Sequence, residues 1–122
     1  MASPEKLVFM VTHGPAEAEL ATIPFVMAAA ALASDVVVVM GFQAGGVELM
    51  HAGVAETVAA PEIPPLAKLL ADVRELGGSL LVCSPCLKSR GIAPADLVAG
   101  AEVVAAARFV AEITSATNTL TY

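Results

Sequence analysis

Four short apolar runs stand out along the chain. They cover residues 7–11, 36–40, 79–82 and 102–105, and the second contains four consecutive valines. A strand that is apolar at nearly every position, instead of at alternate ones, is typical of a sheet covered on both faces, and such sheets are usually parallel. We therefore predict an α/β protein whose mainly parallel sheet lies between layers of helices.

The segments between these runs favour helices. Residues 16–33 are mostly strong helix formers, although they include Pro24, a residue that commonly breaks helices. In residues 66–76 apolar side chains recur at helical spacing, and the pair Gly77 and Gly78 marks the helix end. The remaining predicted elements are short helices at 47–51 and 94–98, a helix at 107–115 and a small final strand at 119–122.

Length and composition indicate one globular unit with an apolar surface. We expect residues 1–122 to form a single domain, because 122 residues is a common domain size. Hydrophobic residues make up 57% of the chain and charged residues 15%, which excludes disorder. With so few charges, a monomer must expose apolar side chains, and we expect a homo-oligomer to cover them. The alternative is a monomer with tightly packed Ala-rich helices.

Charge and hydropathy exclude several classes of partner. Six Lys and Arg against twelve Asp and Glu give a net charge of −6, so the chain lacks the clustered cations that bind nucleic acid or anionic membranes. The longest apolar stretch, residues 21–33, is too short to span a bilayer. No export signal precedes the first predicted strand. We therefore expect a cytoplasmic protein with no nucleic-acid or membrane partner.

Candidate chemistry gathers where the predicted strands end, as is usual in parallel sheets. There the sequence places His13, Cys83 and, three positions later, Cys86. Two sulfurs at this spacing can form a reversible disulfide, or one can resolve a modified form of the other. Without a secretory context, a reduced dithiol is the natural state. Residues 83–91 contain the cations Lys88 and Arg90 and no acid, so we expect these cations and the turn amides to stabilise a thiolate.

Other interpretations of these residues stay open. The cysteines can be two small buried hydrophobic side chains. They can also be half of a zinc site, but only His13 and His51 remain to complete four ligands, and we predict no metal. His13 is either a proton carrier near the sulfur or a structural residue beside a tight turn. Neither a phosphate loop nor a nucleophile elbow is present, so we predict no cofactor and no hydrolase.

The segment 81–92, Leu-Val-Cys-Ser-Pro-Cys-Leu-Lys-Ser-Arg-Gly-Ile, resembles the DsrE/DsrF-like family of sulfur-relay proteins, often labelled peroxiredoxin-like. In that family a cysteine that ends a central strand is followed, after a short helical turn, by an Arg-Gly-aliphatic stretch. Cys83 matches the family's sulfur-carrying cysteine, because Gly91 falls at the expected place after it. Cys86 matches a second cysteine found in some members. The first two predicted strands and the Ala-rich helix extend the resemblance over nearly the whole chain.

The resemblance implies a three-layer α/β/α sandwich with a five-stranded, mainly parallel sheet. It also implies assembly into trimers or hexamers and transfer of a cysteine persulfide between donor and acceptor proteins. Our leading hypothesis is therefore a sulfur carrier on Cys83, with Lys88 and Arg90 stabilising the thiolate. Two further hypotheses are a dithiol oxidoreductase that cycles Cys83 and Cys86, and a non-catalytic oligomeric binding module.

Overall fold

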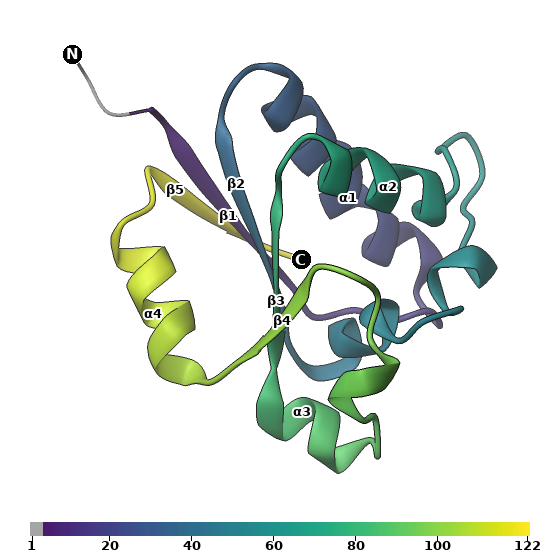
Figure 1. Ribbon diagram of the computed structural model, residues 1–122. Coiled ribbons are helices and arrows are strands. Elements are labelled where there is room, and N and C mark those ends of the chain that lie inside the picture. The colour runs from purple at the N-terminus through teal and green to yellow at the C-terminus, as the bar shows by residue number, and fades with distance from the viewer. Residues whose placement is uncertain (1–3) are drawn as a thin grey trace.

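The computed structural model describes residues 4–122, which build one five-stranded sheet with helices against its faces (Figure 1). The strands are β1 (Lys6–Val11), β2 (Val37–Phe42), β3 (Ser79–Cys83), β4 (Ala101–Val104) and β5 (Asn118–Thr121). Their order across the sheet is β4-β3-β2-β1-β5, and each neighbouring pair runs parallel. The predicted α/β sandwich with a parallel sheet of about five strands is confirmed.

The helices cover the two faces of the sheet unequally. The helices α1 (Ala18–Ala33) and α2 (Leu66–Glu75) pack together on one face, and α4 (Ala106–Thr114) lies on the other (Figure 1). The short helix α3 (Ser84–Ser89) follows β3 without a gap and lies below the sheet. Residues 4–122 also form three 3-10 helices, η1 (Ala44–Met50), η2 (Ala55–Thr57) and η3 (Pro94–Asp96).

Two helical segments differ from what the sequence favours. The helix α1 runs unbroken through Pro24. Its side chains Ala21, Phe25 and Ala28 are fully buried, and their packing in the core stabilises the helix on both sides of the proline. The segment after Cys83, expected as a turn, is the helix α3. Pro85 falls in its first turn, where backbone N–H groups have no partner within the helix. Proline, which lacks an N–H, therefore costs the helix no hydrogen bond there.

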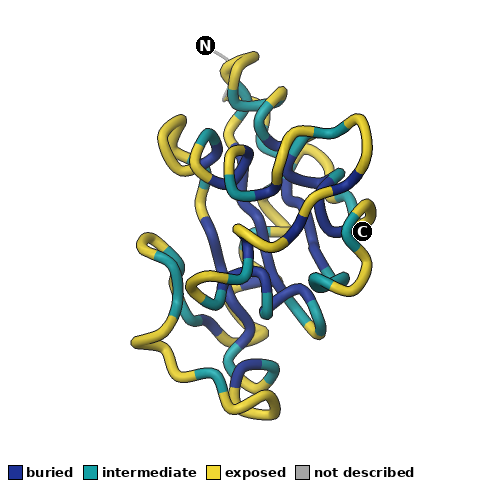
Figure 2. The backbone as a smooth tube through the Cα atoms, turned by 90° about the vertical axis from the view of Figure 1, so that its right-hand side faces the viewer, coloured by how far each residue is buried: buried dark blue, intermediate teal, exposed yellow. Residues whose placement is uncertain are grey.

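The central strands are buried over most of their length (Figure 2). The register aligns Val11 of β1 with Phe42 of β2 and Val82 of β3, so the carboxyl ends of these three strands meet at one edge of the sheet. Phe42 packs against Phe25 of α1 with ring centroids 5.8 Å apart. A rigid, close-packed platform therefore supports the loops that follow the three strands.

Helix α4 depends on one side chain for its packing. Phe109 is its one buried residue, at 4% exposure, and its ring lies 2.8 Å from where a Cβ on Gly41 would be. We expect Phe109→Ala to lower the free energy of unfolding by about 3–5 kcal/mol, measured by urea denaturation. The control Val110→Ala, at a position 57% exposed, should change it by less than about 0.5 kcal/mol. Equal effects from both variants would contradict this role for Phe109.

Candidate functional site

Strand β3 and helix α3 together hold the two cysteines. Cys83 is the last residue of β3, and Cys86 lies in the first turn of α3. Both are free thiols, and their Sγ atoms lie 3.0 Å apart, within hydrogen-bond distance for sulfur. A disulfide needs an S–S distance of about 2.05 Å, so a small movement of the two side chains separates the dithiol from the disulfide.

The two thiols differ in burial and acidity. Cys83 is 9% exposed, whereas Cys86 is partly exposed. Burial raises the pKa of the Cys83 thiol, and its hydrogen bond with Cys86 raises it further. The same hydrogen bond lowers the pKa of Cys86, and the backbone N–H of Ala44 and the charge of Arg90 lower it further, against the opposing effect of burial. The thiolate therefore forms first on Cys86. In the neutral pair Cys86 Sγ donates to Cys83 Sγ, and once Cys86 is deprotonated the Cys83 thiol becomes the donor.

The turn after β2 supplies the backbone donor to Cys86. The N–H of Ala44 donates to Cys86 Sγ across 3.2 Å. Ala44 has a φ of 49°, in the left-handed region that alanine seldom adopts. The turn is held in place by Gly46, where a Cβ would lie 2.0 Å from the carbonyl oxygen of Val11. A strained backbone that points a donor at a reactive sulfur is typical of functional sites.

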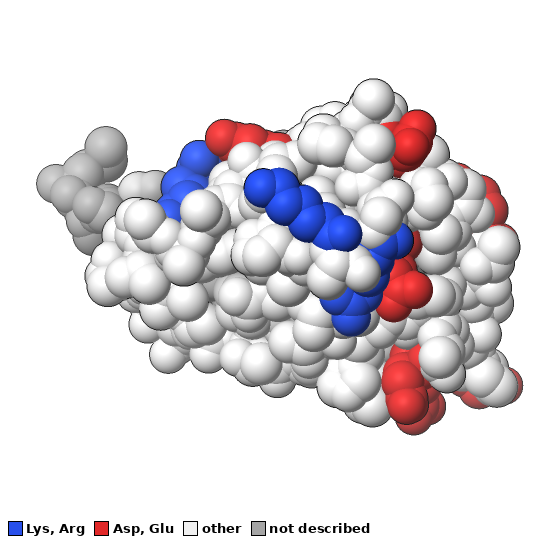
Figure 3. Space-filling model, turned by 90° about the horizontal axis from the view of Figure 1, so that it is seen from below, with Lys and Arg blue, Asp and Glu red and all other residues white. Residues whose placement is uncertain are grey.

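The cations near the cysteines have different surroundings. Arg90 donates from Nη1 to the carbonyl oxygen of Cys86 at 3.3 Å, and its Nε lies 3.7 Å from Oε2 of Glu48. Lys88 forms no ion pair with any other residue of the range 4–122. Seen from below, on the side where α3 lies, cations and acids lie close together on a mostly uncharged surface (Figure 3). Arg90 thus contacts the backbone of Cys86 and also pairs with Glu48, an acid from a distant segment that the sequence around the cysteines did not reveal.

His13 lies two residues beyond β1, in a loop that contacts the turn at Gly45. Its Nδ1 is buried and finds no hydrogen-bond partner within residues 4–122, so it forms no hydrogen bond to either sulfur there. His51 is half-buried, and its backbone pairs with Leu97 in an isolated bridge. In the part of the chain that the structure describes, no three His, Cys, Asp or Glu residues gather as metal ligands.

Comparison with known proteins identifies the family. A family model of the DsrE/DsrF-like family matches residues 5–122. This chain belongs to the DsrE/DsrF-like family. Among curated proteins, the DsrE/DsrF-like chain is 34% identical over 61 residues to the uncharacterized protein MJ0989 of Methanocaldococcus jannaschii. That match covers 50% of this chain and 54% of the relative, about half of each.

Solved structures share the fold of this DsrE/DsrF-like protein. It superposes on the ychN protein from E. coli with a TM-score of 0.82 at 19% identity, covering 97% of this chain and 99% of the other. It superposes on MTH1491 from Methanobacterium thermoautotrophicum, a protein of unknown function, with a TM-score of 0.71 at 18% identity and the same coverage. These likenesses establish the fold of the DsrE/DsrF-like chain.

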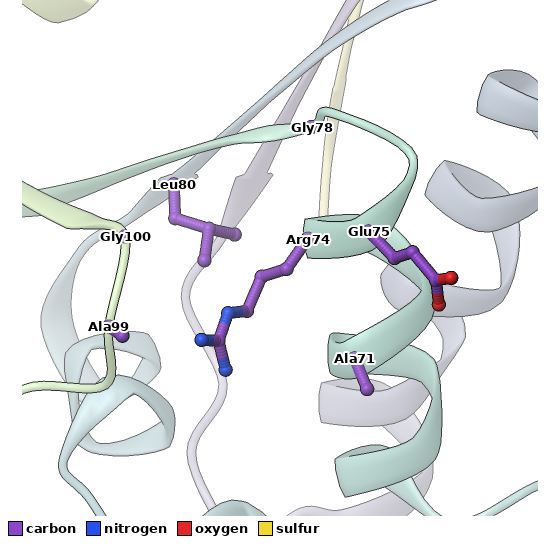
Figure 4. A pocket seen from close by; sticks show the side chains of 7 residues that line it. All are labelled: Ala71, Arg74, Glu75, Gly78, Leu80, Ala99 and Gly100. Atoms are coloured by element: carbon purple, nitrogen blue, oxygen red, sulfur yellow. The ribbon is translucent and has the colours of Figure 1, made fainter.

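One hollow on this DsrE/DsrF-like protein lies away from the cysteines. About 560 Å³ in volume, it lies between α2 and the start of β4, over Leu80. Arg74 points into it and Glu75 points away (Figure 4). Leu80 precedes Cys83 by three residues, or about 10 Å along the strand. Arg74 is exposed in the last turn of α2, where a positive charge interacts favourably with the carboxyl end of the helix dipole. This interaction explains an arginine at this position without a ligand in the hollow.

No helix within residues 4–122 is long and apolar enough to cross a membrane.

Sequence reasoning singled out both cysteines and Arg90, which the structure brings together, but it missed Ala44. The signal for Ala44 was the Gly45-Gly46 pair just after a buried strand, because two adjacent glycines there indicate a tight turn against neighbouring backbone.

Proposed function

We propose that this protein is a sulfur-relay protein that carries sulfane sulfur as a persulfide on Cys83 and passes it to an acceptor protein. The observation that carries the proposal is the pair of free thiols 3.0 Å apart, one buried and one held as the more acidic sulfur. Membership of the DsrE/DsrF-like family supports a sulfur-relay role. The buried position of Cys83 supports carriage, since it keeps a reactive persulfide away from water and free thiols.

Association with further copies is part of this proposal. Large apolar side chains are exposed on α1, at Leu20 and Met27, and on α4, at Val110 and Ile113. Exposed apolar residues on two helices favour a homo-oligomer, for which the family resemblance implies a trimer or hexamer. A cytoplasmic location would keep both thiols reduced between transfers.

A second function is favoured by the same short distance. If Cys86 attacks the inner sulfur of a persulfide on Cys83, a disulfide forms and sulfide leaves, which makes the pair a dithiol oxidoreductase. A reduction potential in the range of dithiol exchangers, with rapid exchange against a dithiol reductant, would support this function over sulfur carriage. If the protein is a non-catalytic binding module instead, Cys83→Ser and Cys86→Ser will leave partner binding intact.

The persulfide is the decisive species to measure. After incubation of the reduced protein with a small-molecule persulfide donor, we expect mass spectrometry to show an added mass of about 32 Da, one sulfur atom, on Cys83. The double variant, with both cysteines changed to serine, is the blank. If a donor that loads a known persulfide carrier leaves no such adduct on this protein, sulfur carriage is excluded.

A further inference from the structure

Resting on the proposed sulfur relay, we infer that Cys86 is the thiol that first receives sulfur from the donor and that Cys83 receives it from Cys86. Three geometric observations carry this order. Cys86 is the more exposed of the two cysteines. It accepts the N–H of Ala44, a donor held in place by a strained turn. It also lies 3.0 Å from Cys83 Sγ, so a second transfer needs little movement.

Accessibility decides the first step. A donor persulfide must bring its outer sulfur into line with the attacking sulfur, and Cys83 is buried at the end of β3. Cys86 lies on the solvent side of the pair, in the first turn of α3. A thiolate is the reactive form of cysteine, and the Ala44 N–H and the Arg90 charge stabilise negative charge at Cys86. An incoming persulfide therefore meets Cys86 before Cys83.

Both transfers balance without an external oxidant or reductant. In the first, Cys86 Sγ attacks the outer sulfur of a donor R–S–SH, the donor S–S bond breaks, and the donor leaves as the thiolate R–S⁻. In the second, Cys83 Sγ attacks the outer sulfur of the Cys86 persulfide, and the bond to Cys86 Sγ breaks. The proton of the Cys83 thiol passes to Cys86 Sγ. Sulfur then resides on the buried cysteine, and it returns to an acceptor by the reverse route.

The structure also identifies how Cys83 acts before it carries sulfur. While both thiols are protonated, Cys86 Sγ donates to Cys83 Sγ. Once Cys86 has lost its proton, only the Cys83 thiol can donate, and this reversed hydrogen bond lowers the pKa of Cys86, the receiving sulfur. A serine at position 83 keeps an O–H donor at this place, whereas an alanine does not. The pair Cys83→Ser and Cys83→Ala therefore separates the donor role of residue 83 from its role as sulfur carrier.

The test measures the rate of loading at pH 7 by rapid quench and mass spectrometry, with a small-molecule persulfide as donor. We expect Cys83→Ser to gain sulfur on Cys86 faster than Cys83→Ala does, because serine keeps a hydrogen-bond donor for the Cys86 thiolate. We expect Cys86→Ser to load at least about tenfold more slowly than wild type. In wild type, fragment spectra should show the added sulfur on Cys86 at early times and on Cys83 later, a readout that does not depend on any variant folding.

The possible results separate the two proposals. If Cys86→Ser loads as fast as wild type while Cys83→Ser does not load, the protein is a sulfur carrier but the inferred order is wrong. If wild type shows sulfur on Cys83 from the earliest time, the order is likewise overturned. If no variant and no wild-type sample gains sulfur from a competent donor, the relay itself fails and the order fails with it.

Discussion

Gly46→Ala is expected to destabilise the protein by at least about 3 kcal/mol and to impair the cysteine site. A Cβ at this position would lie 2.0 Å from the carbonyl oxygen of Val11 and 2.8 Å from its carbonyl carbon. Both atoms belong to the backbone of Val11, at the fully buried end of strand β1, so no side chain can rotate away to make room. The turn must move instead, and with it the Ala44 N–H that reaches Cys86.

Thermal or urea denaturation measures the loss of stability, and thiol alkylation measures the loss of the N–H contact. The matched control is Ala44→Gly, in the same turn. Glycine adopts a φ of 49° without strain and keeps the backbone N–H, so we expect its stability to stay within about 1 kcal/mol of wild type and Cys86 to stay acidic. Wild-type stability in Gly46→Ala would show that the turn does not lie against Val11 as described.

Alkylation of the native protein at neutral pH is expected to modify Cys86 at least about tenfold faster than Cys83. Cys86 is more exposed and has the lowered pKa, whereas burial raises the pKa of Cys83. Only the thiolate reacts with an alkylating agent, so the rate rises with pH as Cys86 loses its proton. Because the pKa of Cys86 is lowered in the folded protein, the midpoint should lie below that of an ordinary solvent-exposed cysteine.

Variants at position 83 test the cause of this acidity. The hydrogen bond from Cys83 is the largest contribution that lowers the pKa of Cys86, so Cys83→Ala should move the midpoint of the pH profile upward. Cys83→Ser, which keeps a hydroxyl donor, should move it less. A midpoint that stays the same in Cys83→Ala would contradict the hydrogen bond as the cause. Faster alkylation of Cys83 than of Cys86 in wild type would reverse the assignment of the thiolate.

Most of the fold could be predicted from local sequence. Runs such as 36–40 and 79–82 are apolar at nearly every position because both faces of the sheet are covered, and that pattern is visible without coordinates. The helix 84–89 was less predictable, since six residues that include Pro85 carry no helical periodicity. Pro24 pointed to a break in α1 that burial of the helix overrides.

Local sequence was enough to predict that Cys83 ends a buried strand and that Cys86 and Arg90 follow closely, because spacing and strand position are local properties. Which sulfur carries the negative charge could not be predicted from the sequence. That depends on the Ala44 N–H, which comes from a turn 42 positions away, and on the difference in burial between two neighbouring thiols. A pKa responds to every dipole and charge around the sulfur, and the folding of distant segments against one another sets those surroundings.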